Sequence, residues 1–168
     1  MMKIGIIADT HDNQNAIKNA ITIFQEEKVN YIFHCGDFIA PFSVKAFFKA
    51  DIPLRLCFGN NDGEIRMIRD LVINQENCVL GEIILLADIG GKKIAMTHGH
   101  HSNILNMALT SGNFDVVFSG HFHRKEMEKL SNGTLHINPG EGGGWLTESP
   151  SLAILNLDTL EAKFVDIT

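Results

Sequence analysis

The order of apolar and polar residues in the N-terminal part of the chain predicts alternating strands and helices. Short apolar runs, rich in β-branched and aromatic residues, predict strands at Lys3–Ala8, Asn30–His34 and Leu54–Phe58. Between them, Asn15–Glu27 repeats apolar residues at the spacing of an amphipathic helix, and a second helix is expected at Pro41–Lys49. This alternation is typical of a parallel sheet with helices on its faces, joined by right-handed crossovers.

The remainder of the chain predicts more antiparallel pairing. A helix is expected near Asn103–Ser111, and the segments Glu82–Ala87 and Lys92–Thr97 flank a glycine-containing loop typical of a hairpin. Further strands are expected at Asp115–Ser119, Lys125–Leu130, Thr134–Asn138, Leu152–Leu157 and Ala162–Ile167. Because no linker, internal repeat or low-complexity tract interrupts the sequence, we expect one α/β domain over residues 1–168, with α+β character in its second half.

Composition and charge narrow the class of protein. The 168 residues are 45% hydrophobic and 20% charged, which fits a globular domain and not a disordered chain. The formal net charge of −6 makes bulk binding to nucleic acid unfavourable. No apolar run approaches the length of a membrane helix, so we expect a cytoplasmic protein without a membrane partner. Three cysteines without a C-x-x-C pair argue against a disulfide framework and a thiolate zinc site.

Polar clusters directly follow several of the predicted strands. They are Asp9-Thr10-His11-Asp12, Gly36-Asp37, Gly59-Asn60-Asn61-Asp62, His98-Gly99-His100-His101 and Gly120-His121-Phe122-His123. In open α/β sheets, the loops at the carboxyl ends of the strands converge and carry the ligand sites. We therefore expect these clusters to meet at one edge of the molecule.

The residue types in these clusters are ligands for divalent first-row metals. Seven side chains are candidates, more than one tetrahedral site uses: Asp9, His11, Asp37, Asn60, His98, His121 and His123. If Asp37 bridges two ions, each ion has four protein ligands and keeps an open position, which catalysis requires. Because two divalent ions meet only two carboxylates, the centre is net positive and an anionic substrate is expected.

The motifs themselves carry a family resemblance. The series D-x-H, G-D, G-N-x-D, a histidine and G-H-x-H runs in this order from Asp9 to His123 and resembles that of the calcineurin-like metallophosphoesterases, in particular their small single-domain phosphodiesterase branch. The resemblance implies two mixed β-sheets packed face to face with helices outside, a four-layer α-β-β-α sandwich. It also implies a phosphodiesterase with two divalent transition-metal ions, Mn²⁺ or Ni²⁺ first and Fe or Zn as alternatives. By the family pattern, one ion is held by Asp9, His11, Asp37 and His123, and the other by Asp37, Asn60, His98 and His121.

The chemistry expected of such a centre is direct hydrolysis. Our mechanistic hypothesis is attack on phosphorus by a hydroxide that bridges the two ions. The chain departs from the family at Asn61, where many members have a histidine that can protonate the leaving group. An amide cannot do this, so we expect rates to depend strongly on the pKa of the leaving group. As catalytic candidates, Asn61 can orient the phosphate by hydrogen bonding, and His100 is a substitute proton donor.

Other conspicuous residues have simpler interpretations. Asp62 is interpreted as a turn residue and His101 as a cap of the helix that follows it. His34 and His136 lie in predicted strands and are interpreted as structural histidines. Gly140–Gly144 is interpreted as a flexible loop, because the Gly-Lys-Ser/Thr of a phosphate-binding loop is missing.

Alternatives remain at the level of function. A metal-binding scaffold for protein interactions with little turnover, like the metallophosphoesterase-like subunit of retromer, is the main one, and Asn61 gives it some weight. A metallo-β-lactamase-type hydrolase is set aside because His98–His101 lacks the aspartate of the H-x-H-x-D-H motif. The substrate stays open among monoesters, diesters and cyclic nucleotides. A small diester is favoured, since no basic residue except Arg124 stands beside the motifs. A homo-oligomer is one option.

Overall fold

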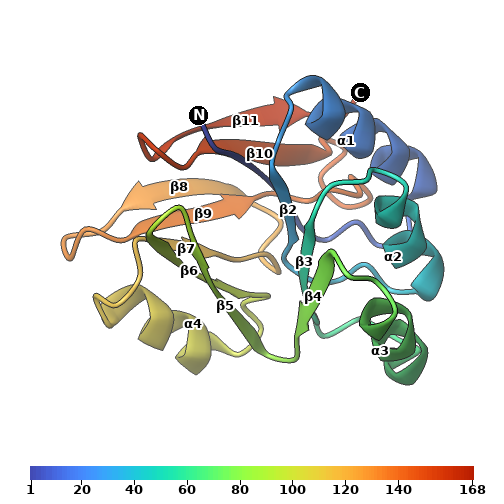
Figure 1. The fold of residues 1–168 in the computed structure, drawn as a ribbon, viewed down its shortest axis with the longest axis horizontal. Coiled ribbons are helices and arrows are strands. Elements are labelled where there is room, and N and C mark those ends of the chain that lie inside the picture. Colours follow the sequence, from blue (N-terminus) through green and yellow to red (C-terminus); the bar gives the residue numbers. More distant parts are fainter.

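The computed structural model describes residues 1 to 168, and its strands form two sheets (Figure 1). The larger sheet contains β1 (Lys3–Ile7), β2 (Tyr31–His34), β3 (Leu54–Cys57), β4 (Cys78–Gly81), β10 (Ser151–Asn156) and β11 (Glu161–Asp166). Its strand order is β11-β10-β1-β2-β3-β4, with β1 to β4 parallel and β10 antiparallel to both of its neighbours.

The second sheet has five strands and mixed pairing. It contains β5 (Ile84–Ile89), β6 (Lys92–Thr97), β7 (Val116–Phe118), β8 (Lys125–Lys129) and β9 (Leu135–Pro139), in the order β5-β6-β7-β9-β8. The pairs β6–β7 and β7–β9 are parallel, whereas the outer pairs β5–β6 and β8–β9 are antiparallel. The antiparallel character expected in the second half is therefore confined to the edges of this sheet and to β10 and β11.

Helices cover the outer faces of both sheets. The larger sheet carries α1 (Gln14–Glu26), α2 (Pro41–Phe48) and α3 (Ile65–Ile73), and the second sheet carries α4 (Ser102–Thr110) (Figure 1). None of these helices has the length and apolarity needed to cross a bilayer. The inner faces of the sheets pack against each other, with the rings of Phe33 and Phe118 in edge-to-face contact at 5.1 Å between centroids. The predicted four-layer α-β-β-α sandwich is thus confirmed.

Close packing between α1 and the larger sheet fixes the first strand under its helix. The apolar stripe of α1 is buried at Ala16, Ile17, Ala20 and Phe24. Asn13 caps this helix, because its side-chain oxygen accepts the N–H of Ala16 at 3.2 Å. A Cβ atom on Gly5 would lie 2.5 Å from the ring of Phe24, so β1 needs glycine here.

The structure contains one helix and one strand that the sequence pattern does not predict. Residues 64–81 form α3 and the edge strand β4. The helix carries a periodic signal, since Ile68 and Val72 are buried four positions apart. The strand signal is weak, because β4 is short and none of its residues is fully buried.

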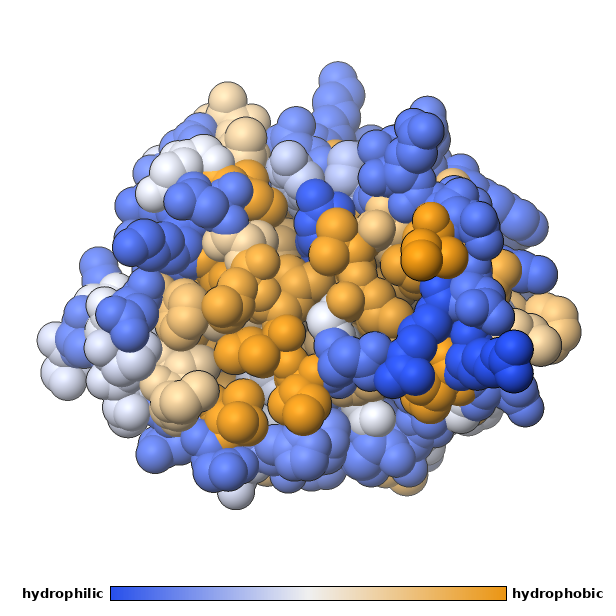
Figure 2. All heavy atoms as spheres, turned by 60° about the horizontal axis from the view of Figure 1, so that its bottom comes forward, coloured by the Kyte–Doolittle hydropathy of each residue, from blue (hydrophilic) through white to orange (hydrophobic).

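Exposed apolar side chains gather on one face of the molecule. Figure 2 shows a broad apolar area on the side that Figure 1 places at the bottom, where α3, α4 and the connection from β4 to β5 lie. The exposed apolar side chains of α3, β4, β5 and α4 include Ile73, Val79, Leu86 and Met107. Because β4 and β5 are edge strands, no further strand covers this side of the sheets.

Candidate metal centre

The loops that follow β1, β2, β3, β6 and β7 bring the candidate ligands together. The seven residues are Asp9, His11, Asp37, Asn60, His98, His121 and His123. Their polar atoms approach one another from loops of both sheets: His98 Nε2 lies 3.5 Å from Asp37 Oδ2 and 4.0 Å from Asp9 Oδ1. Clustering of the polar loops at the strand ends, as expected for an α/β sheet, is therefore present here.

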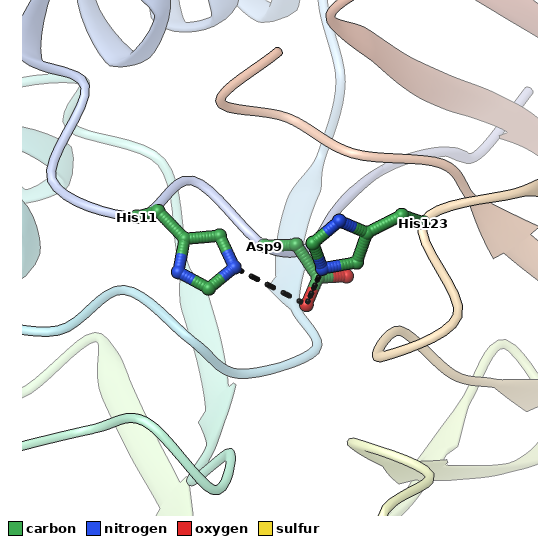
Figure 3. A group of neighbouring side chains, drawn as sticks. All are labelled: Asp9, His11 and His123. Carbon is green, nitrogen blue, oxygen red and sulfur yellow. Dashed lines mark ion pairs between the residues drawn. The ribbon is translucent and has the colours of Figure 1, made fainter. Parts of the chain in front are cut away.

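Three of these side chains converge on one carboxylate oxygen. The Nε2 atoms of His11 and His123 lie 4.0 Å and 3.4 Å from Asp9 Oδ1 and point at it from different loops (Figure 3). Both Asp9 Oδ1 and His11 Nε2 are buried and form no hydrogen bond. Buried polar atoms are rarely left unpaired, so a missing partner is indicated between them. A cation fits the chemistry of these donors, and the three ligand atoms lie close enough together to share one.

A second group surrounds Asp37. His98 Nδ1 lies 2.8 Å from the carbonyl oxygen of Cys35, which can only accept, so Nδ1 carries the proton and donates it. On the other side of the ring, Nε2 faces Asp37 and lies 3.1 Å from the side-chain oxygen of Asn60. The ring of His121 stands 5.1 Å from that of His98. A carbonyl oxygen that orients the far nitrogen is the usual support of a metal-binding histidine.

The two carboxylates control the charge of the histidines around them. Burial alone would raise the pKa of Asp37, but His98 and the N–H groups of Asn61 outweigh it and hold this pKa well below its usual range. Burial would likewise lower the pKa of His98, and Asp37 with Asp9 reverses that effect and raises it. The hydrogen bond to Asp9 raises the pKa of His123. Without an ion, these two histidines therefore tend to hold a proton in its place.

Burial is the largest influence on the pKa of two neighbouring histidines, and here no carboxylate reverses it. It lowers the pKa of His121, and the proximity of His98 lowers it further. It also lowers the pKa of His100, with a second contribution from His101. The neutral form of both rings is thus favoured, which for His121 is the form that a metal ligand requires.

The backbone of the ligand loops is strained. Five of the seven candidate ligands have a positive φ, between 42° and 71°: Asp9, His11, Asp37, His121 and His123. Side chains other than glycine rarely adopt this left-handed conformation, although aspartate and histidine tolerate it better than most. Such strain tends to gather at functional sites, where the surrounding structure maintains it.

Asp62 ties two ligand loops together, a role beyond the turn predicted for it. Its carboxylate accepts the backbone N–H groups of Ile39, Gly59 and Asp37 at 2.6, 2.7 and 3.1 Å. The side chain of Asn61 is also engaged, because its Nδ2 donates to Asp37 Oδ2 at 2.7 Å. The G-N-N-D cluster therefore positions Asp37 from two sides.

The loop between β9 and β10 is fastened to the site, although the sequence suggested a flexible segment. Gly142 and Gly143 donate to the carbonyl oxygens of Ala8 and Asp9 at 2.8 and 2.9 Å. A Cβ atom on Gly142 would lie 2.7 Å from the Ala8 oxygen, which explains glycine here. Sequence reasoning also missed Glu141, a buried carboxylate 3.7 Å from the Nδ1 atom of His123.

The remaining histidines lie outside the cavity. His34 and His136 are buried in β2 and β9, where they pair with Thr10 and Ser119 at 3.0 and 2.8 Å, as expected of structural residues. His101 occupies the N-cap of α4 but makes no capping hydrogen bond with its side chain. His100 stacks beside it at 4.1 Å between ring centroids.

An open cavity of about 620 Å³ exposes the cluster to solvent. Its walls are formed by His11, Asp37, Asn60, Asn61, His121, Phe122, His123, Glu141, Trp145 and Leu146. No lysine or arginine is among them, and neither is His100. A ligand in this cavity would therefore meet five of the seven candidate metal ligands, the carboxylate of Glu141 and an apolar wall.

Comparison with known proteins gives a consistent family. Residues 2–160 match the family model of the calcineurin-like phosphoesterase superfamily domain. Over 164 residues, covering 96% of this chain and 97% of the relative, the chain is 41% identical to phosphodiesterase MJ0936 of Methanocaldococcus jannaschii. It is 28% identical over 176 residues to the probable metallophosphoesterase YsnB of Bacillus subtilis, covering 98% and 91% of the two chains.

Solved structures agree with this relation. The structure of an archaeal phosphodiesterase superposes with a TM-score of 0.92 at 38% identity, over 98% of this chain and 99% of the other. Vps29 of Entamoeba histolytica, solved with zinc, shares the fold with a TM-score of 0.65 at 16% identity, over 99% and 100% of the two chains. The matching domain and the shared fold show that this chain belongs to the calcineurin-like phosphoesterase superfamily.

Proposed function

We propose that the protein is a metal-dependent phosphodiesterase with a dinuclear centre. The observation that carries the proposal is the convergence of His11 and His123, which line an open cavity, on an unpartnered, buried oxygen of Asp9. The assignment of the ions follows the family pattern, with Asp37 shared between the two groups. Identity of 41% to a protein named a phosphodiesterase supports the same activity here.

The protein's own residues would hold the ions and shape their surroundings. One group is Asp9, His11, Asp37 and His123; the other is Asp37, Asn60, His98 and His121. Two ions would supply the positive charge that draws phosphoryl oxygens and would lower the pKa of water toward neutrality. Asn61 holds the shared carboxylate through its Nδ2 atom, and Cys35 orients His98 through its carbonyl oxygen.

Charge around the cavity favours a diester over a monoester. A monoester carries a second negative charge near neutral pH, and no lysine or arginine lines the cavity to balance it. The carboxylates of Asp37 and Glu141 would repel that charge. A small diester, with a single charge, suits the two ions without further basic groups.

The finer assignments are part of the same proposal. Histidine, carboxylate and amide ligands suit Mn²⁺ or Ni²⁺, with Fe or Zn as alternatives. We propose that residues 1–168 act as one domain in the cytoplasm, since both sheets contribute loops to a single site. Bulk nucleic-acid binding is not expected at a net charge of −6, and a homo-oligomer is compatible with the proposal.

The decisive experiment measures hydrolysis of bis(p-nitrophenyl) phosphate by metal-stripped protein after addition of Mn²⁺, Ni²⁺ or Zn²⁺. We expect turnover that depends on metal and is abolished by His121→Ala and Asp37→Asn. His101→Ala and Asp70→Asn are matched controls, because both residues are exposed and lie outside the cavity. Metal content, measured on each variant, should be two ions in the native protein and fewer in the ligand variants.

The same experiment tests the scaffold alternative. Two bound ions with no turnover on activated diesters would contradict the proposed enzyme and favour a metal-binding interaction protein. Hydrolysis that survives both ligand substitutions would show that the activity comes from another site or a contaminant.

A further inference from the structure

We infer that the apolar wall of the cavity is a subsite for a planar, aromatic substituent of the phosphodiester, and this inference rests on the proposed function. The wall consists of Phe122, Trp145 and Leu146, which we call the apolar rim. Its side chains are 44%, 62% and 78% exposed, an unusual exposure for residues of this size beside a polar cluster.

The apolar rim is held in place by hydrogen bonds. The indole Nε1 of Trp145 donates to the carbonyl oxygen of His11 at 3.1 Å. The buried carboxylate of Glu141 accepts the backbone N–H groups of Leu146 and Thr147 at 3.0 and 2.8 Å. The rim residues that follow β9 are therefore anchored to a candidate ligand loop and to a buried acid. A preformed wall costs less ordering on binding than a mobile one.

Phe122 is positioned by the ligands on either side of it. It lies between His121 and His123 in the chain, and its ring is edge-on to that of His121, with 5.1 Å between the centroids. The rim thus presents two aromatic rings in the same cavity as five of the candidate metal ligands. None of the three side chains of the rim is charged.

This composition selects the chemistry of the ester group. A methyl or other small alkyl ester would leave the rings in water, whereas a flat aromatic group would cover them and stack. Stacking of a nucleobase or aryl ring on an aromatic side chain contributes roughly a tenfold or greater gain in affinity. The shared chemistry is a planar aromatic ring, which an aryl diester or a nucleoside diester would supply.

The test compares monoanionic diesters that differ in one substituent. Methyl phenyl phosphate, methyl cyclohexyl phosphate and thymidine 5′-methyl phosphate are titrated into the metal-loaded protein. Because Trp145 is the single tryptophan of the chain, its fluorescence reports binding at the rim directly. Inhibition constants against bis(p-nitrophenyl) phosphate hydrolysis give a second measure. We expect the phenyl ester to bind about tenfold more tightly than the cyclohexyl ester of similar size.

Three variants assign this preference to the rim. Trp145→Ala and Phe122→Leu should lower the ratio of phenyl to cyclohexyl affinity toward one, while Trp145→Phe should keep most of it. Ile73→Ala removes an exposed apolar side chain on α3, far in sequence from the rim and absent from the cavity wall, and should leave the ratio unchanged. A ratio is used because damage to the metal centre would weaken both esters alike.

The outcomes separate the subsite from the activity. Hydrolysis without any ring preference, or a preference that Trp145→Ala leaves intact, would overturn the subsite alone. Ring preference with fluorescence quenching but no hydrolysis would overturn the enzymatic activity alone. If the thymidine ester binds more tightly than the phenyl ester, the ring is a nucleobase; the reverse order assigns an aryl group.

Discussion

Replacing Asp62 with asparagine should loosen the two loops that carry Asp37 and Asn60. The carboxylate accepts three backbone N–H groups, two at Oδ2 and one at Oδ1. An asparagine can keep the bonds to Asp37 and Gly59 with its oxygen, but its NH₂ group then faces the N–H of Ile39. One charge-assisted hydrogen bond is lost, and a buried donor meets another donor.

The size of the effect follows from these contacts. Losing a hydrogen bond to a charged group and leaving a buried N–H unpaired costs about 2 to 4 kcal/mol. Burial raises the pKa of Asp62, so removing its charge returns part of this cost, and the lower half of the range is expected. For a chain of this length, that corresponds to a fall in Tm of roughly 4 to 12 °C.

Thermal unfolding of the metal-free protein measures this loss. Asp70→Asn is the matched control, because it removes the same charge from an exposed position on α3 and should change stability by less than about 0.5 kcal/mol. Metal binding supplies a readout that a purely structural role would not move: affinity should fall about 10- to 100-fold in Asp62→Asn. If the two variants melt together and bind metal equally, Asp62 does not position the ligand loops.

Three further predictions concern residues of the site. His11→Gly should be more stable than His11→Ala by about 1 kcal/mol, because φ at this position is 42°. Both variants should be inactive. Equal Tm values for the two variants would show that the backbone at His11 is not strained. Metal binding should release protons at about pH 6 and become tighter toward about pH 8. The reason is that Asp9 and Asp37 raise the pKa of His98, and a hydrogen bond to Asp9 raises the pKa of His123. Calorimetry in buffers of different ionisation enthalpy detects this release, and binding heats that do not depend on the buffer would contradict it. Rates on diesters should fall steeply as the pKa of the leaving group rises, and Asn61→His should flatten that dependence; a flat series for the native protein would show that another proton donor is present.

The location of the site could be predicted from the sequence, whereas its support could not. Polar clusters after apolar runs mark the ends of strands, and parallel strands bring those ends to one edge. The link from Asp62 to Ile39 joins residues more than twenty positions apart through backbone N–H groups, which leave no trace in residue type. The same holds for Trp145, whose bond to the His11 carbonyl depends on how the loop after β9 folds.

The fold, too, could be predicted from the sequence only in part. Buried strands such as β1 and β2 can be predicted from the sequence because both of their faces are covered and the apolar run is continuous. The edge strand β4 cannot, because one side lacks a neighbouring strand and its residues are only partly buried. Which strands share a sheet depends on packing between the sheets, such as the contact of Phe33 with Phe118, and periodicity carries no information about it.

Strain and unpaired polar atoms at the same place have one common explanation. Five candidate ligands have left-handed backbone, and three of them, Asp9, His11 and His123, also carry a buried atom without a partner. Each feature alone destabilises the folded chain, and neither improves packing. A cation between the loops would give the unpaired atoms a partner and offset the strain, because binding to the folded form alone adds about 4 kcal/mol of stability at a thousandfold excess over Kd. The metal-free chain should therefore be the less stable form, and its melting temperature should rise with metal concentration, but not in Asp9→Asn.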